Sequence, residues 1–415
     1  MNPIASRINW IYQKHKHLIH SLLLRQAPRF VYARDPAELE GEIPVFTFHV
    51  ALPEWFEEQC LHLARNGYEA LSAEKFVDLM HRTGHTPRKS VLITFDDGLK
   101  QLWTVAFPLL KRYGLRATCF LIPGCIPADS SLVRPTLEDV WQGRASVEEV
   151  LAFRRGEPAL ATWEEIRIMH DSGVVDFHSH TMHHSLVFTS PEVFDFIHPA
   201  YNTHFYGNIH VPMYARNGRD VTSREPLLGM PIYQSAPRMQ APARFFDDER
   251  VRMHCVEEVQ RQGGPAFFAH GDWRKRLRNL VRDSRSASRV NERYETSEER
   301  DRTILEELIT SRQVIEQKLP GAKVTHLCYP WYEAKPFAIE ASRRAGFEVN
   351  YFGHRASRPT NRPGQDLYGV VRVEDMFLER LPGTGRVTLA QIAQRLRSLR
   401  SLPGRLFPDA QGTPA

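Results

Sequence analysis

Short apolar runs alternate with helical segments in the first third of the chain, and no other feature constrains the fold as strongly. The runs lack the polar alternation of a half-exposed strand, so both faces of each strand should be buried. A glycine follows each helical segment, which is where helices commonly end. The apolar runs are 43–48, 90–95 and 117–122, and the helical segments are 53–66 and 102–113. Buried strands joined by helices predict parallel β/α units.

The same pattern returns later in the chain. Thr162 and Glu165 have the spacing of a capping box, which predicts that a helix begins there. Further strands are expected at 174–177, 324–327 and 368–373. Residues 186–300 interrupt the pattern and are rich in Pro, Tyr, Phe and Arg. The sequence therefore predicts an α/β fold with one long insertion.

Composition excludes several classes of protein. The five cysteines include no CxxC pair, so neither a disulfide framework nor a cysteine-rich zinc site is expected. No run of 18 apolar residues occurs, and no small-residue cleavage site follows the short apolar piece at 18–24. These features predict a reduced, cytoplasmic protein.

Positive charge is concentrated near the two ends of the sequence. The formal net charge is +5, which is too small to indicate a nucleic-acid partner. Residues 1–34 carry six basic and no acidic residues, and residues 381–408 carry five basic and no acidic residues. The remainder has a net charge of −6, so peripheral contact with an anionic membrane surface is expected through the terminal segments. An amphipathic helix packed on the body of the protein is the alternative for residues 1–34.

Two adjacent carboxylates, Asp96 and Asp97, follow the apolar run that ends at Phe95, and Gly98 comes next. In a parallel β/α barrel the strand C-termini face the active site. Two carboxylates there repel each other unless a cation or a proton lies between them, so one can bind a metal while the other acts as a base. A solvated Asp-Asp-Gly turn is the alternative.

Four histidines occur within seven residues after the apolar run 174–177. They are His178, His180, His183 and His184. Imidazole is the commonest metal ligand near neutral pH. The spacing allows either His178 with His180 or His180 with His184 as the ligand pair, and the other histidines then have structural roles.

The sequence Thr94-Phe-Asp-Asp-Gly98, followed by His180-Thr-Met-His-His184, resembles the polysaccharide deacetylase family, carbohydrate esterase family four. The resemblance implies a deformed (β/α)-barrel of about seven parallel strands, a variant of the closed barrel of β/α units. It also implies that Asp96 is the catalytic base, and that Asp97, His180 and His184 hold one divalent metal ion, most simply Zn²⁺. It covers residues 43–185 and 300–375.

Two departures from the family pattern concern the partners of the base. The run Cys328-Tyr329-Pro330-Trp331 resembles the third family motif, but Cys328 stands where the family often has arginine. Arg372, in a late strand, is the candidate replacement. No Leu-His pair supplies the general acid near the C-terminus, but His49 follows the first strand, as in the permuted branch that includes bacterial exopolysaccharide deacetylases. His49 is therefore the expected acid, and Tyr329, Pro330, Trp331 and Arg372 are expected at the substrate.

The resemblance implies a hydrolase that removes the acetyl group from an N-acetylated saccharide. Two alternatives stay open, namely hydrolysis of another C–N bond, such as an N-formyl sugar or a cyclic amide, and a catalytically silent saccharide-binding protein. Cys328 could also be a nucleophile, but no histidine partner can be inferred for it.

The expected organisation follows from these assignments. The insertion should cap the barrel mouth and set substrate choice, and it contains His198, His204 and His210. The five expected parts are an N-terminal basic amphipathic segment (1–42), the first part of the barrel (43–185), the insertion (186–300), the second part of the barrel (301–380) and a basic C-terminal helix and tail (381–415).

Overall fold

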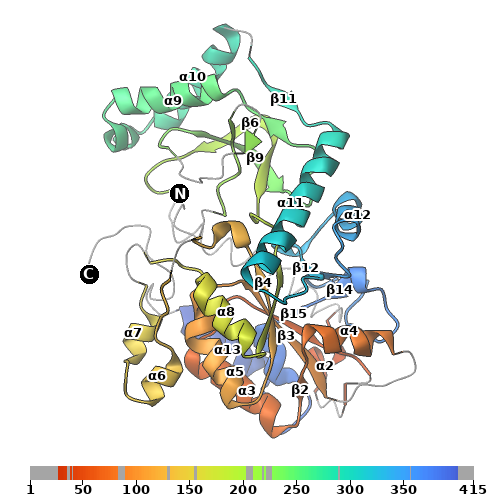
Figure 1. Ribbon diagram of the computed structural model, residues 1–415. Coiled ribbons are helices and arrows are strands. Elements are labelled where there is room, and N and C mark those ends of the chain that lie inside the picture. The colour runs from red at the N-terminus through yellow and green to blue at the C-terminus, as the bar shows by residue number, and fades with distance from the viewer. Residues whose placement is uncertain are drawn as a thin grey trace.

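The computed structural model describes most of residues 27–400 (Figure 1). The described range has gaps at 35–37, 40, 83–88, 129–130, 154–156, 202–208, 217–218, 221–226, 288–289 and 356. Most of the N-terminal basic segment, the tail after residue 400 and His204 lie outside the described residues. Within the described part, each helix is too short or too polar to cross a membrane.

A nearly closed barrel of eight parallel strands forms the body of the protein, which confirms the predicted fold class. Neighbouring strands follow the order β14-β13-β12-β5-β4-β3-β1-β15, and the short β2 (Glu69–Ala70) also pairs with β3. The barrel strands are β1 (Val45–Phe48), β3 (Ser90–Asp97), β4 (Ala117–Leu121), β5 (Val175–Ser179), β12 (His326–Cys328), β13 (Val349–Phe352), β14 (Val370–Val371) and β15 (Val373–Glu374).

The last two strands are consecutive pieces of one chain segment, separated only by Arg372. Val370 of β14 pairs with Tyr351 of β13, whereas Val373 of β15 pairs with Phe46 of β1. This segment therefore lies between the two ends of the sheet. The expected number of about seven strands is met when the segment is counted as one strand, as in a β/α barrel closed by its last strand.

Side chains alternate between the inside and the outside of the barrel, as the two-residue period of a strand requires. In β3, Val91, Ile93 and Phe95 belong to the large apolar cluster beneath the surrounding helices. Leu92 belongs to a second cluster together with Cys328, Tyr351 and other residues of the barrel interior. Asp96 has the same parity as Leu92, so it faces the interior at the carboxyl end of its strand.

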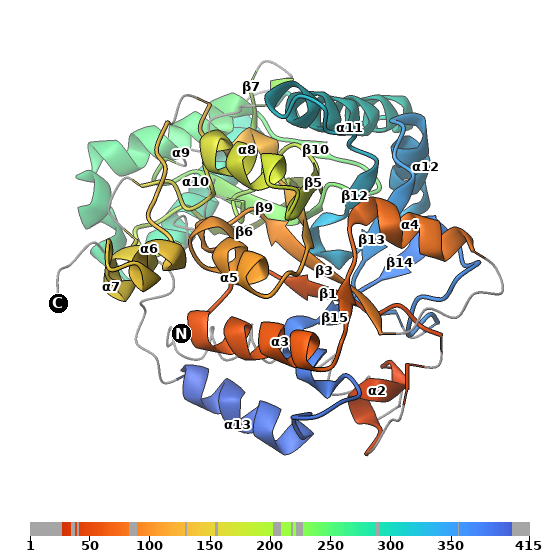
Figure 2. The same cartoon turned by 60° about the horizontal axis from the view of Figure 1, so that its bottom comes forward.

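Helices surround the barrel, as Figure 2 shows. The predicted helix at 102–113 is present as a π-helical turn (η1, Leu102–Ala106) that continues into α5, and the predicted capping box of Thr162 and Glu165 begins α8. The helices of the barrel part are α2 (Arg29–Tyr32), α3 (Pro53–Arg65), α4 (Ala73–His81), α5 (Phe107–Arg112), α6 (Leu137–Trp141), α7 (Val147–Leu151), α8 (Trp163–Asp171), α11 (Ser297–Lys318), α12 (Pro336–Arg344) and α13 (Leu389–Arg400).

The insertion forms a lobe beside the barrel with its own two apolar clusters (Figure 1). Its main sheet pairs β6 (Leu186–Phe196) with β9 (Pro231–Pro237), and α11 leads the chain back to the barrel. Its other elements are β7 (Ala215–Arg216), β8 (Arg219–Asp220), β10 (Phe245–Phe246), α9 (Glu249–Arg261), α10 (Trp273–Ala287) and β11 (Arg293–Tyr294). Because β6 begins just after β5, the lobe leaves the barrel at the carboxyl end of a strand.

Candidate active site

The loops at the carboxyl ends of the strands have an unusual backbone. Six non-glycine residues among those described have a positive φ, a region that side chains other than glycine rarely adopt. Five of them lie at the carboxyl end of β3 or in the loops after β5 and β12: Asp97, Thr181, His184, Trp331 and Tyr332. Backbone strain of this kind persists where the surrounding structure holds it in place, and it is common at functional sites.

Asp97, His180 and His184 come together at this end of the barrel. One ligand atom from each lies within 4.8 Å of the others, and all three residues are buried. The Nε2 atom of His180 lies 3.5 Å from Oδ1 of Asp97. Nδ1 of His180 lies 2.8 Å from the carbonyl oxygen of Cys328, so Nδ1 carries the proton and donates it. This hydrogen bond orients the ring and leaves Nε2 available to a metal.

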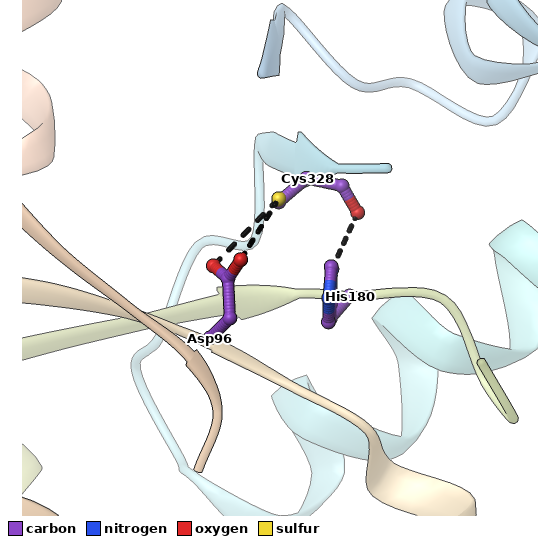
Figure 3. A group of neighbouring side chains, drawn as sticks. All are labelled: Asp96, His180 and Cys328. Carbon is purple, nitrogen blue, oxygen red and sulfur yellow. Dashed lines mark hydrogen bonds between the residues drawn. The ribbon is translucent and has the colours of Figure 1, made fainter. Parts of the chain in front are cut away.

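A second cluster shares His180 with the first. Asp96, His180 and Cys328 also bring three donor atoms within 4.8 Å of one another (Figure 3). Burial raises the pKa of the Cys328 thiol well above its ordinary value, and the carboxylate of Asp96 is already bound to Arg372. The donor set of one carboxylate and two imidazoles therefore fits a catalytic zinc ion better, because such a set leaves coordination positions open.

Arg372 forms a bidentate ion pair with Asp96 inside the barrel. Its Nη1 and Nη2 atoms lie 2.6 and 2.9 Å from the two carboxylate oxygens, and both side chains are almost completely buried. Burial opposes ionisation of the carboxyl group, but the charge and hydrogen bonds of Arg372 outweigh it and hold the pKa of Asp96 well below its usual range. Arg372, the single residue between β14 and β15, thus brings its guanidinium group to the carboxylate of Asp96.

His49 is a further neighbour of Asp96. Its Nε2 atom is 3.9 Å from Oδ2 of Asp96, and its side chain is 35% exposed while Asp96 is 2% exposed. The ring of Tyr332 packs edge-on to His49, with 6.2 Å between the ring centres. His49 is thus close to the expected base and still accessible to a ligand in the barrel mouth.

The four residues expected at the substrate occupy different environments in the structure. Tyr329 is fully buried in the outer apolar cluster, and its hydroxyl donates to the carbonyl oxygen of Ala338. Arg372 instead lies inside the barrel, where its guanidinium is bound to Asp96. Cys328 faces the interior, so its neighbour Tyr329 must face outward. Pro330 is also buried.

Trp331 is half-buried at the barrel mouth. Its ring centre lies 5.0 Å from that of the ligand candidate His184 and 5.3 Å from that of His210. Of the histidines expected in the insertion, His210 therefore reaches the site. His198 instead packs against Trp273, with 5.3 Å between the ring centres.

Two supporting residues were not found by sequence reasoning. Tyr332 packs over Gly353, where a Cβ atom would lie 2.6 Å from that of Tyr332. At Gly124 a Cβ atom would lie 2.4 Å from Nδ1 of His183, so this glycine allows the histidine loop to approach the loop after β4. Tyr332 directly follows the Tyr-Pro-Trp run, and this position could have indicated a place at the site. No sequence feature near Gly124 indicates its contact with His183.

Part of the chain matches a family of known proteins. Residues 83–195 match the family described as polysaccharide deacetylase. Over this segment the chain is similar to the polysaccharide deacetylase family. The region that matches this deacetylase family contains Asp96, Asp97, His180 and His184, whereas His49, Trp331 and Arg372 lie outside it.

Curated relatives of this deacetylase homologue match over part of their length. YxkH of Bacillus subtilis (strain 168), which is named for the polysaccharide deacetylases, is 29% identical over 119 residues. Poly-beta-1,6-N-acetyl-D-glucosamine N-deacetylase of Escherichia coli (strain K12) is 30% identical over 125 residues. The matches cover 27% and 30% of this chain, and they span 43% and 16% of the two relatives.

Two solved structures match most of this chain at low identity. A de-N-acetylase from Aggregatibacter actinomycetemcomitans has a TM-score of 0.48 and 16% identity, and the match covers 85% of this chain and 99% of that one. A deacetylase domain from Bordetella bronchiseptica has a TM-score of 0.47 and 15% identity, with 82% and 97% of the two chains covered.

Proposed function

We propose that this protein is a metal-dependent hydrolase that removes the acetyl group from the nitrogen of an N-acetylated saccharide. The observation that carries the proposal is the juxtaposition of the Asp97-His180-His184 donor set with the buried Asp96–Arg372 pair at the mouth of the barrel. A carboxylate held ionised beside a metal-binding set suits the hydrolysis of an amide by water.

Asp97, His180 and His184 would hold one divalent ion, and Zn²⁺ fits their mixture of oxygen and nitrogen ligands. When bound, the ion would polarise the acetyl carbonyl group and lower the pKa of water from 15.7 toward 7. The chain supplies the orientation of the ligands, because the Cys328 carbonyl oxygen fixes the His180 ring.

Asp96 accepts the proton of the attacking water in this mechanism. Arg372 keeps the carboxyl group ionised and fixes both of its oxygens, so the base does not rotate away from the reacting atoms. His49 would donate a proton to the departing amine, which is a poor leaving group without one. The 3.9 Å between His49 Nε2 and Asp96 Oδ2 allows both groups to act on one bound amide.

The amide belongs to a saccharide in this proposal because the family and its named relatives indicate that substrate class. Trp331, at the mouth between His184 and His210, offers an indole edge or face for a sugar ring. A silent saccharide-binding protein is a weaker alternative, because Arg372 supplies the positive charge that Cys328 lacks. The cytoplasmic location and membrane contact stay predictions.

The test is acetate release from N-acetylglucosamine oligomers by the purified, zinc-loaded protein. We expect turnover in the native chain and a loss of at least about 100-fold in Asp96→Asn, the range of general base catalysis. Hydrolysis of N-formyl sugars or cyclic amides in place of N-acetyl sugars would support the alternative C–N hydrolase. Normal turnover by Asp96→Asn would refute the assignment of the base.

A further inference from the structure

Cys328 lies beside the catalytic apparatus without a role in the proposed reaction. It ends β12, faces the barrel interior and is fully buried. Its Sγ atom is 3.7 and 3.9 Å from the two oxygens of Asp96 and 3.8 Å from the carbonyl oxygen of Tyr329 (Figure 3). The thiol is therefore within reach of both other donors of the second cluster, the Asp96 carboxylate and the His180 imidazole.

The three side chains in Figure 3 form a donor set of one sulfur, one oxygen and one nitrogen, whose atoms lie within 4.8 Å of one another. We propose that Asp96, His180 and Cys328 form a second metal site, selective for thiophilic ions such as Cd²⁺. Because Nδ1 of His180 donates to the Cys328 carbonyl group, only Nε2 is available. The second site and the Asp97-His180-His184 site therefore exclude each other, and the chain binds one ion at a time.

Selectivity follows from the competition for Asp96. Arg372 already bonds to both carboxylate oxygens, so an ion that gains its affinity mainly from oxygen ligands has little to gain here. A thiophilic ion gains instead from the sulfur, since soft thiolate ligands select soft metals. On binding, the S–H bond of Cys328 breaks, a metal–sulfur bond forms, and the proton leaves to solvent.

A metal ion bound at this second site would inhibit the proposed hydrolysis. The ion would take His180 from the first donor set and Asp96 from its place beside the reacting water. This consequence rests on the proposed function, whereas the existence of the site does not. Binding and inhibition are therefore measured separately.

The binding experiment adds Cd²⁺ to the metal-free full-length protein and follows the ultraviolet charge-transfer absorption of cadmium–thiolate bonds. We expect a band that saturates at one Cd²⁺ per chain. Cys328→Ser should abolish the band, whereas Asp97→Asn should keep it because it damages only the first site. Cys119→Ser is the matched control, since Cys119 of β4 is equally buried but belongs to the outer cluster.

The proposal is overturned if the native chain gives no band, if the band survives in Cys328→Ser, or if Cys119→Ser abolishes it. The ¹¹³Cd resonance of the native chain provides a measurement that needs no variant. A downfield position typical of sulfur ligation supports the site, and a position typical of oxygen and nitrogen ligands alone refutes it. Cadmium binding without deacetylation would contradict only the proposed function.

Discussion

Replacement of Arg372 by methionine removes the positive charge next to Asp96 and keeps much of the length of the side chain. The native pair is bidentate, at 2.6 and 2.9 Å, and almost completely excluded from water. Removing one partner of such a pair leaves an uncompensated buried charge, which costs about 3–5 kcal/mol. We expect the free energy of unfolding of Arg372→Met, measured by urea denaturation at pH 7, to fall by that amount.

The stability lost in Arg372→Met should depend on pH in a direction that follows from the pKa of Asp96. Arg372 holds the pKa of Asp96 below its ordinary value, so the pair stabilises the native fold at any pH above that value and loses this effect only in strong acid. In Arg372→Met burial is the largest remaining influence and raises the pKa of Asp96, while His180 and His49 oppose it. The folded variant then takes up a proton more readily than the unfolded chain, so its deficit relative to the native protein should shrink as the pH falls.

A double variant separates the charge from the shape of the side chain. Arg372→Met with Asp96→Asn leaves no buried charge, so it should recover most of the stability lost in Arg372→Met alone. If the single variant is as stable as the native chain, or if the double variant is no more stable than the single one, the reasoning about this ion pair is wrong.

Three further results are expected. Zinc should raise the melting temperature of the native chain, because a ligand that binds the folded state stabilises it by mass action. Asp97→Asn should abolish this rise, and an undiminished rise would show that Asp97 is not a zinc ligand. Gly124→Ala should lower the free energy of unfolding, measured by urea denaturation, by about 1–3 kcal/mol, because the added methyl group overpacks against His183. Gly271→Ala is the control and should have little effect, because no atom lies near its added methyl group. Burial lowers the pKa of His62 to about 4, so the unfolding free energy should decrease as the pH falls from 6.5 toward 4, and this slope should be smaller in His62→Leu.

The parallel strands and the metal donor set could be predicted from the sequence because both are local signals. Each buried strand is a continuous apolar run, and the paired carboxylates and the histidines follow directly after two such runs. The carboxyl ends of neighbouring parallel strands meet, so β3, β4 and β5 bring Asp97 and His180 together. Spacing alone left two histidine pairs open, and the family resemblance selected one of them.

Two other features of the site could not be predicted in the same way, because they depend on contacts between distant parts of the chain. They are the ion pair of Arg372 with Asp96 and the packing of His210 against Trp331. Arg372 lies 276 residues after Asp96, and only closure of the barrel brings them together. His210 reaches Trp331 through a lobe whose strands show no regular apolar period in the sequence. Tyr329 was expected at the substrate, although the alternation of β12 with Cys328 inside could have placed it outside.

The position of Arg372 in the closing segment has a consequence for synthesis on the ribosome. β1 is among the first strands to be made, but its edge partner Val373 appears more than three hundred residues later. Until that segment leaves the ribosome, the nascent barrel has an open seam and the carboxylate of Asp96 lacks its counter-charge. The residue that lies at the seam also supplies the counter-charge of Asp96, so in the proposed reaction a nascent chain that is still open would lack a correctly held base.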